Sequence, residues 1–286
     1  MLEPNSASAA LGALLPTDES PDHEHIVAFR RCAELLLNQC TLRIAGVAHR
    51  LTEIEFYWTS TAHADPFTHR DPLQQEFARW YFHRLGGTYR GGTFKGLDIA
   101  IGSPQRHAGI LLRGIENTSS GERTDGSCSV VEKILANTKN PTIAALVDSF
   151  DRLIDGPTGS TSPLHLELDR PGKVRVILAS ARVGLTLKRG ADRARCSFLD
   201  RHYRFLVEPT RLRKGRLHLA IARHQAGDAL ETIHRQTSIA RAPIKRYLAA
   251  FAAGHGRNPA DYRHKLTTTE LCELLGALAS RSSQDR

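Results

Sequence analysis

Residues 53–58 constrain the fold of this chain more than any other segment. Apolar and polar side chains alternate along it: Ile54, Phe56 and Trp58 point one way, and Glu53, Glu55 and Tyr57 point the other. Alternation with a period of two predicts a β-strand with one face against a core. Within so apolar a segment, it is unusual for two carboxylic acids and a phenol to serve only as solvent-exposed side chains. We therefore expect these three side chains to lie over a substrate.

The charge of the chain is strongly basic and unevenly distributed. The 286 residues contain 39 Lys and Arg against 30 Asp and Glu, a net charge of +9. Residues 201–265 hold 14 of these cations and four acids, so this segment accounts for the whole surplus. A basic excess of this kind favours a polyanionic partner, and nucleic acid is the most economical choice.

The cysteines predict neither a zinc site nor a disulfide framework. All five are scattered without paired spacing: Cys32, Cys40, Cys128, Cys196 and Cys272. The sequence also contains no run of eighteen apolar residues and no signal-like start. We expect a soluble intracellular protein with reduced thiols, in the cytoplasm or associated with the nucleoid, with no membrane partner.

Three regions follow one another along the chain. Residues 1–24 are rich in Ser, Pro, Asp and Glu, which predicts a disordered arm. Residues 25–208 mix helices and strands: a helix at 24–39, strands at 41–45, 50–58, 97–101, 109–115, 164–167, 173–178 and 202–207, and helical segments within 129–155. Residues 209–286 read as basic helices at 217–225, 228–237, 241–253 and 268–280, the last opening on a capping box from Thr267 to Glu270.

A colinear set of motifs over about residues 26–207 resembles the alkyladenine (3-methyladenine) DNA glycosylase family. The motifs are Glu53-Ile54-Glu55-Phe56-Tyr57, Gly87-Thr88, Gly96, Ile110-Leu111-Leu112-Arg113 with Glu116, Ala181-Arg182-Val183-Gly184, and Tyr203-Arg204-Phe205-Leu206-Val207. The resemblance implies an α+β fold with a mixed, largely antiparallel curved sheet and surrounding helices. It also implies an enzyme that flips a nucleotide out of duplex DNA and hydrolyses its N-glycosidic bond.

The resemblance assigns roles to three residues. Glu55 would activate the water, Arg113 would lie beside the water and that carboxylate, and Tyr57 would stack on the extruded base. The chemistry is reasonable in itself, because a carboxylate can both deprotonate water and stabilise an oxocarbenium-like sugar. It requires no metal and no cofactor. The alternatives are a purely structural Glu–Arg ion pair and a core aromatic at Tyr57, and we expect Glu53 to be structural.

A pocket histidine is also implied, and two candidates follow Tyr57. His63 and His69 both lie near the family's position, and neither has its spacing. We favour His63 narrowly, because Ala62 precedes it as in the family. A loop histidine paired with a neighbouring aspartate is the alternative for either residue.

The glycine-rich segment 86–96 departs from the family pattern. Counted without gaps, a second stacking aromatic falls on Gly92, and the aromatic that wedges into the DNA stack falls on Lys95. The missing side chains at Gly91 and Gly92 would widen the pocket, which favours a bulky or hypermodified base such as those of phage DNA. Lys95 could contact a phosphate, act as the wedge, or attack the sugar as a Schiff-base amine.

The basic C-terminal region contains a helix-turn-helix-like pattern at residues 230–248. We expect Arg241, Lys245 and Arg246 to contact DNA phosphates there, with Arg90, Lys95 and Arg182 as further contacts from the glycosylase-like region. A basic helical cap that only confers solubility is the alternative.

The sequence therefore predicts a monomeric, monofunctional DNA glycosylase that acts on double-stranded DNA in repair or in defence against phage. Two rival functions remain: a non-catalytic DNA-binding regulator that uses the helix-turn-helix, and a nucleoside or RNA N-glycosidase on the same fold. Loss of turnover without loss of binding in Glu55→Gln would separate the enzyme from the regulator.

Overall fold

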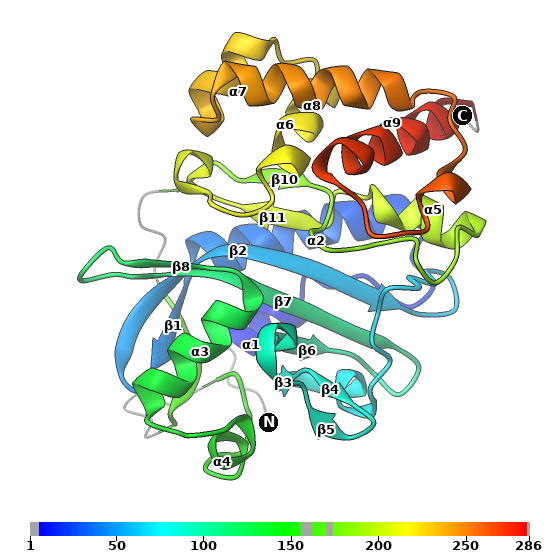
Figure 1. The fold of residues 1–286 in the computed structure, drawn as a ribbon. Coiled ribbons are helices and arrows are strands. Elements are labelled where there is room, and N and C mark those ends of the chain that lie inside the picture. The colour runs from blue at the N-terminus through cyan, green and yellow to red at the C-terminus, as the bar shows by residue number, and fades with distance from the viewer. Residues whose placement is uncertain (1–5, 156–161, 170–173, 285–286) are drawn as a thin grey trace. The chain divides into compact units, whose positions relative to one another are not determined.

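The computed structural model describes residues 6–155, 162–169 and 174–284 (Figure 1). The chain divides into two compact units. The first is built from Met1–Ala64, Thr68–Ile177 and Phe205–Val207, and the second from Asp65–Phe67, Leu178–Arg204 and Glu208–Arg286.

A largely antiparallel sheet forms the centre of the first unit. Its strands are β1 (Cys40–Ile44), β2 (Val47–Thr59), β3 (Phe77–Phe82), β6 (Leu97–Ile101), β7 (His107–Asn117), β8 (Arg123–Asp125), β9 (Leu164–Leu168) and β11 (Arg204–Leu206). Strands β11, β2, β7, β6 and β3 are neighbours in that order, β1 joins β2 to β9, and β8 pairs with β7. A separate hairpin consists of β4 (Arg84–Leu85) and β5 (Thr88–Tyr89). The α+β fold class predicted from the sequence is confirmed.

Helix α2 (Asp22–Asn38) covers the apolar face of β2. The ring of Phe29 stacks on that of Phe56 with centroids 4.5 Å apart, and both residues are fully buried. The other helical elements of this unit are α1 (Ala7–Gly12), α3 (Ser127–Thr138), α4 (Ile143–Val147), η1 (Pro72–Gln75) and η2 (Gly92–Phe94). Because α2 packs against the face of β2 that carries Phe56, the face that carries Glu53 and Glu55 points away from this helix.

The prediction of a disordered arm over residues 1–24 is wrong for residues 6–24. Ser6 caps α1 by accepting a hydrogen bond from the backbone N–H of Ala9, and Leu11 is fully buried. The backbone N–H of Ser8 donates to the Asp155 carboxylate at 3.0 Å. The alanine and leucine residues of α1 thus form an apolar helix face. The average composition of residues 1–24 does not reveal this face, because polar residues surround it in the sequence. Residues 1–5 lie outside the described residues.

The second unit is mainly helical. It contains β10 (Leu178–Ser180), α5 (Arg193–Leu199), η3 (Pro209–Arg211), α6 (Arg216–Gln225), α7 (Leu230–Thr237), α8 (Arg241–Gly254), η4 (Pro259–Tyr262) and α9 (Thr268–Gln284). The four helices expected after residue 209 are confirmed within a few residues of their predicted ends. The capping box is confirmed too: the Glu270 N–H donates to Thr267 Oγ1, and the Thr267 N–H donates to the Glu270 carboxylate.

The boundary between the units differs from the one expected at residue 208. Ala181, Leu187, Cys196 and Leu199 join the apolar core of the helical unit, together with residues of α6, α8 and α9. Residues 178–204 therefore pack with the C-terminal helices, because their apolar side chains complete that core. Among the described residues, no helix has both the length and the apolar composition that a membrane crossing requires.

Candidate active site

Two β-bulges lie where β2 meets β7. Leu51 pairs with Ile115, Glu53 with Gly114, and Ile54 with Leu112, so Thr52 on β2 and Arg113 on β7 are extra residues in the ladder. A bulge changes the direction of a side chain and is frequent beside active sites. Arg113 is two residues beyond Leu111, which lies opposite Glu55, so its side chain lies on the acidic face of β2 beside the bulge.

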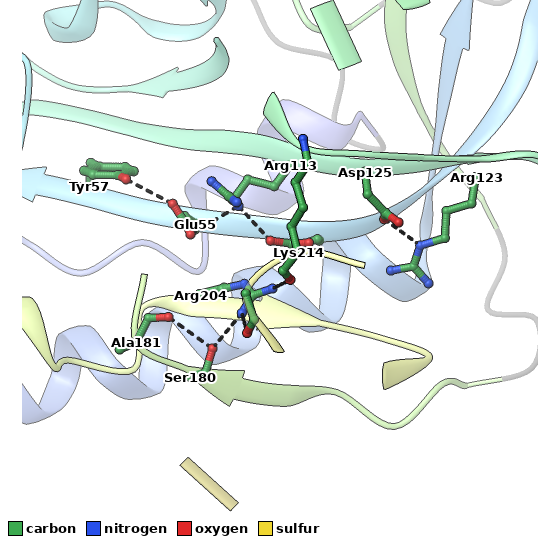
Figure 2. A network of polar contacts seen from close by, with 11 residues as sticks. Glu55, Tyr57, Arg113, Arg123, Asp125, Ser180, Ala181, Arg204 and Lys214 are labelled. Atoms are coloured by element: carbon green, nitrogen blue, oxygen red, sulfur yellow. Dashed lines mark hydrogen bonds and ion pairs between the residues drawn. The ribbon is translucent and has the colours of Figure 1, made fainter. Parts of the chain in front are cut away.

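Arg113 contacts both glutamates of that face. Its Nε lies 2.7 Å from Glu53 Oε1 and 3.2 Å from Glu55 Oε1. The hydroxyl of Tyr57 donates a hydrogen bond to Glu55 Oε2 at 3.0 Å, as Figure 2 shows. We call these four residues the charged cluster. The sequence prediction that Glu55, Arg113 and Tyr57 lie together is confirmed as geometry.

The charged cluster is buried and carries more negative than positive groups. Glu53 and Glu55 are fully buried, and Arg113 is 7% exposed. Burial by itself lowers the pKa of Arg113, but the negative charges of Glu55 and Glu53 outweigh it, so the net pKa is raised above the ordinary arginine value. The guanidinium thus stays charged at every physiological pH.

The contacts of Arg113 with Glu53 and Glu55 are made through Nε. Its two terminal amino groups carry four N–H donors in a plane. They can hold a water molecule or an oxygen of a bound ligand beside Glu55.

Strand β8 adds a further ion pair next to the bulge. Asp125 pairs with Gly114 in the ladder, and the Gly126 N–H donates to the carbonyl of Arg113 at 2.6 Å. Arg123 Nε donates to Asp125 Oδ1 at 2.8 Å, and both side chains are almost completely buried. Figure 2 shows this pair along the strand from Arg113.

A second polar group lies across the sheet on the same face. The register places Glu55 opposite Leu111, Leu111 opposite Asp98, and Asp98 opposite Tyr81. Gly109 faces Tyr57 in the ladder, and a Cβ on Gly109 would lie only 2.6 Å from Asp98 Oδ2. The Asp98 carboxylate therefore covers the glycine opposite Tyr57.

Asp98 is held by two side chains. His83 Nε2 lies 2.7 Å from Asp98 Oδ1, and Gln74 Nε2 donates to Asp98 Oδ2 at 3.4 Å. We call these three residues the polar row. The ring of His69 lies against that of His83, with centroids 4.3 Å apart. Of the two candidate histidines, His69 is therefore the one on the Tyr57 side of the sheet.

Desolvation, then the positive charges of His83 and Arg90, lowers the pKa of His69 to about 4. The residue is nonetheless exposed by accessible area. The ring contacts those of His83 and Tyr81, which accounts for the desolvation. His69 is thus neutral near pH 7 and can both donate and accept a hydrogen bond.

The preference for His63 as the pocket histidine is wrong. Its ring stacks on that of His25 in α2 with centroids 4.1 Å apart, and its Nδ1 lies 2.6 Å from Asp22 Oδ1. His63 also meets the edge of Phe29, so it lies on the Phe56 side of β2, away from Glu55. His63 instead fits the alternative prediction of a loop histidine that pairs with an aspartate, here Asp22.

Gly92 and Lys95 contact α3. Cys128 Sγ donates to the Gly92 carbonyl at 3.1 Å, and Lys95 Nζ pairs with Glu132. The hydrogen bond to Glu132 raises the pKa of Lys95 above its ordinary value. A Schiff base forms from an unprotonated amine, so this pairing disfavours the lyase role of Lys95.

Arg90 lines a surface pocket of about 430 Å³ beside the β4–β5 hairpin. The other lining residues are Leu85, Thr88, Tyr89, Gly91 and Phe94. Arg90 Nε donates to the Arg84 carbonyl at 3.3 Å, which holds its side chain along the hairpin. Phe94 is 71% exposed, so an aromatic side chain does project from this segment, one position before Lys95.

The prediction that Arg182 contacts DNA is wrong. Its side chain is 1% exposed, and its two terminal nitrogens donate to Asp65 at 2.5 and 3.3 Å. A further hydrogen bond reaches the Phe198 carbonyl at 3.2 Å. Arg182 therefore fastens Asp65–Phe67 to the helical unit and is inaccessible to a phosphate.

Helices α7 and α8 form the predicted helix-turn-helix-like pair. Ser238 has φ +55°, the left-handed conformation that the turn requires, and Ile233, Ile239 and Ile244 form a small core between the helices. On α8, Lys245 and Arg246 are exposed. Arg241 is exposed as well, but it is paired with Glu231 of α7 at 2.7 Å.

Sequence reasoning missed the polar row and the Arg123–Asp125 pair. One signal was present: Asp98 is the single charged residue in the otherwise apolar strand Leu97–Ile101. Only the register of three strands, β2, β7 and β6, however, shows that Asp98 and Glu55 share one face.

Comparison with known proteins finds a relative in a virus. Its sequence is 31% identical over 202 residues to the uncharacterized protein L759 of Acanthamoeba polyphaga mimivirus, which covers 65% of this chain and 88% of the viral protein. The chain belongs to the same family as this mimivirus protein. A search of protein-family models found no match.

Proposed function

We propose that this protein is a monofunctional DNA glycosylase that hydrolyses the N-glycosidic bond of a modified base in duplex DNA. The observation that carries the proposal is the charged cluster, in which one buried carboxylate, Glu55, is oriented by Arg113 and by Tyr57. The colinear resemblance to alkyladenine DNA glycosylases supports the same reaction. The base would first leave the stack, because its glycosidic bond is inaccessible within a duplex.

Glu55 acts as the general base in this scheme. A water beside Glu55 loses its proton to the carboxylate while its oxygen attacks C1′ of the deoxyribose. The C1′–N bond breaks, the electron pair leaves with the base, and an abasic site remains. Because the sugar becomes cationic on the way, the excess negative charge of the buried cluster stabilises that state most.

Arg113 and Tyr57 position the reacting groups. The guanidinium holds Glu55 Oε1 and offers its terminal donors to the attacking water. Tyr57 fixes Glu55 Oε2 through its hydroxyl and presents its half-buried ring to the extruded base. Glu53 anchors the guanidinium from the other side at 2.7 Å, which fits a structural role.

The substrate that we propose is a bulky or hypermodified base of the kind found in phage DNA. Gly91 and Gly92 support this choice, because the space around their Cβ positions is open to 4 Å. The polar row and His69 supply hydrogen-bonding groups near Tyr57 that could recognise the edge of such a base. The exposed cations Lys245 and Arg246 would hold the DNA backbone.

The test is base release from a panel of duplexes containing natural, alkylated, deaminated and hypermodified bases. Wild type should form abasic sites in at least one duplex, and Glu55→Gln should abolish that activity while duplex affinity stays the same. Glu24→Gln removes an exposed carboxylate and serves as the charge-matched control. Faster release of small alkylpurines than of any bulky base would refute the substrate class while leaving the reaction intact.

A second function is favoured by the α7–α8 pair, which has the form of a DNA-binding motif without need of catalysis. In that case the protein is a DNA-binding regulator. Tight duplex binding with no base release across the panel would support the regulator and refute the glycosylase. Base release from single-stranded RNA or free nucleosides alone would instead indicate the nucleoside or RNA N-glycosidase.

A further inference from the structure

A buried arginine holds the backbone of a surface turn in the second unit. Arg204 is fully buried, and its guanidinium donates to the carbonyls of Lys214 and Gly215, each at 3.0 Å, and to Ser180 Oγ at 3.2 Å. Figure 2 shows Arg204 between Ser180 and Lys214. Two consecutive carbonyls are thereby fixed by one planar group.

Gly215 is required by this arrangement. Its φ is +69°, and an added Cβ would lie 2.5 Å from Val183 Cγ2 and 2.7 Å from Arg204 Nη1. On the other side of the turn, Leu212 is 2% exposed and anchors the chain in the interior. The backbone of residues 212–216, which we call the basic turn, is therefore held at both ends.

The basic turn presents two cations to solvent. Arg213 and Lys214 are both exposed, and neither has an ion pair with any described residue. Nearby Arg211 is different, because it is paired with Glu208 at 3.1 Å. A buried guanidinium thus supports a turn whose own positive charges have no partner within the described chain.

The basic turn is also tied to the helix-turn-helix-like pair. Arg216 Nη2 donates to the carbonyl of Ser238, the turn residue between α7 and α8, at 3.3 Å. The unpaired cations of the turn and those of α8 therefore belong to one helical unit, whose segment 201–265 has an excess of ten cations over acids.

We propose that the basic turn is a preformed phosphate clamp, in which Arg213 and Lys214 contact neighbouring phosphates of duplex DNA. A polyanion fits better than a protein partner, because Arg213 and Lys214 bring charge without the aromatic or apolar anchors that dominate protein interfaces. Fixing the backbone beforehand lowers the entropic cost of binding. This clamp rests on duplex DNA as the partner in the proposed function and adds contacts to those of α8.

The test compares two variants that each remove two exposed cations. Arg213→Ala/Lys214→Ala removes the clamp, and Arg263→Ala/Lys265→Ala removes the same charge from another exposed loop of the same unit. The probe is a labelled 25-base-pair duplex without modified bases, titrated by fluorescence anisotropy from 50 to 200 mM salt. The clamp variant should bind on the order of tenfold more weakly, with the slope of log affinity against log salt reduced by about 2. Equal behaviour of the two variants would overturn the proposal.

Gly215→Ala tests the rigidity of the turn without changing any charge. It should weaken binding of the same duplex by several fold, whereas Gly256→Ala, at an open position with φ +77°, should leave binding unchanged. Normal binding by Gly215→Ala would refute preorganisation. These experiments measure duplex affinity and not base release. The clamp proposal can therefore hold even if the protein is not a glycosylase. A wild type that binds no duplex would refute the clamp itself.

Discussion

In the charged cluster, two carboxylates and a guanidinium are buried together, whereas in the basic turn Arg213 and Lys214 are exposed with no anionic partner among the described residues. Burial makes charge interactions strong, specific and independent of salt, which suits chemistry at one atom. Exposure makes them weak, additive and screened, which suits affinity for a long polyanion. Arg113 and Arg204 nevertheless share one task, since each is a buried guanidinium that orients a neighbouring group. The comparison predicts that substitutions in the first unit change turnover or folding, and those in the second change binding.

The largest expected effect is that of Glu55→Gln on turnover. Loss of the general base should reduce base release by about 10²–10⁴-fold, because the amide cannot accept the proton of the attacking water. Duplex affinity should stay within a factor of two. Single-turnover kinetics on the best substrate of the panel measure the first quantity. If the variant keeps its turnover, Glu55 is not the general base, and the charged cluster is not the catalytic site.

Arg113→Met should cause the largest loss of stability. It removes the guanidinium that contacts the buried carboxylates of Glu53 and Glu55, and removal of one partner from a buried ion pair costs about 3–5 kcal/mol. Urea unfolding followed by circular dichroism measures the change. The double variant Glu53→Gln/Arg113→Met should recover part of the loss, because one of the two carboxylates that lose the guanidinium is replaced by a neutral amide. A loss as small as that of an exposed Arg→Met change would contradict the electrostatic account.

Lys245→Ala/Arg246→Ala should weaken duplex binding severalfold and reduce the salt slope by up to about 2, without changing the urea midpoint. Both side chains are exposed on α8, so folding does not depend on them. Combined with Arg213→Ala/Lys214→Ala, the losses should multiply if the two sites contact separate phosphates. If the α8 variant binds the duplex as tightly as wild type, the basic turn is the main DNA contact of the two.

The smallest effect concerns pH. Because the pKa of His69 is lowered to about 4 in the folded protein, the unfolded chain takes up the proton first as the pH falls below the ordinary histidine pKa of about 6.5. The folded state therefore loses stability between about pH 6.5 and 4 and loses no more below that range. His69→Gln should flatten this part of the stability profile slightly, since the residue is partly solvated. An unchanged profile would show that His69 titrates normally.

Much of the fold could be predicted from short-range pattern. The Glu-x-Glu-x-Tyr alternation, the helix periodicities after residue 209 and the Thr267–Glu270 capping box are local signals, and the structure has each of them at the expected place. The contact of Glu55 with Arg113 was implied by the resemblance to alkyladenine DNA glycosylases, and the structure has it. The roles inferred from that pairing stay predictions.

The misplaced residues all depended on long-range contacts. His63 and His69 have similar sequence surroundings, and only packing against His25 or His83 distinguishes them. Arg182 looks like any other cation until Asp65, 117 residues earlier, is found beside it. The contact of Arg113 with both glutamates depends on the register of two strands, which neither strand encodes alone.

The paired bulges of β2 and β7 have a consequence for how this part of the chain can vary. The pairing offset is the same at Leu51–Ile115 as at Ile54–Leu112, because the extra residue on one strand compensates for the extra residue on the other. Deleting Thr52 alone would therefore shift β2 by one position and turn Glu55 and Tyr57 toward the helix-covered side, or push the mismatch into the rest of the ladder. Deleting the extra residue from both strands would restore the ladder but remove the arginine. Single-residue deletions are therefore tolerated in this part of the ladder only in pairs, one on each strand, whereas substitutions leave the register unchanged.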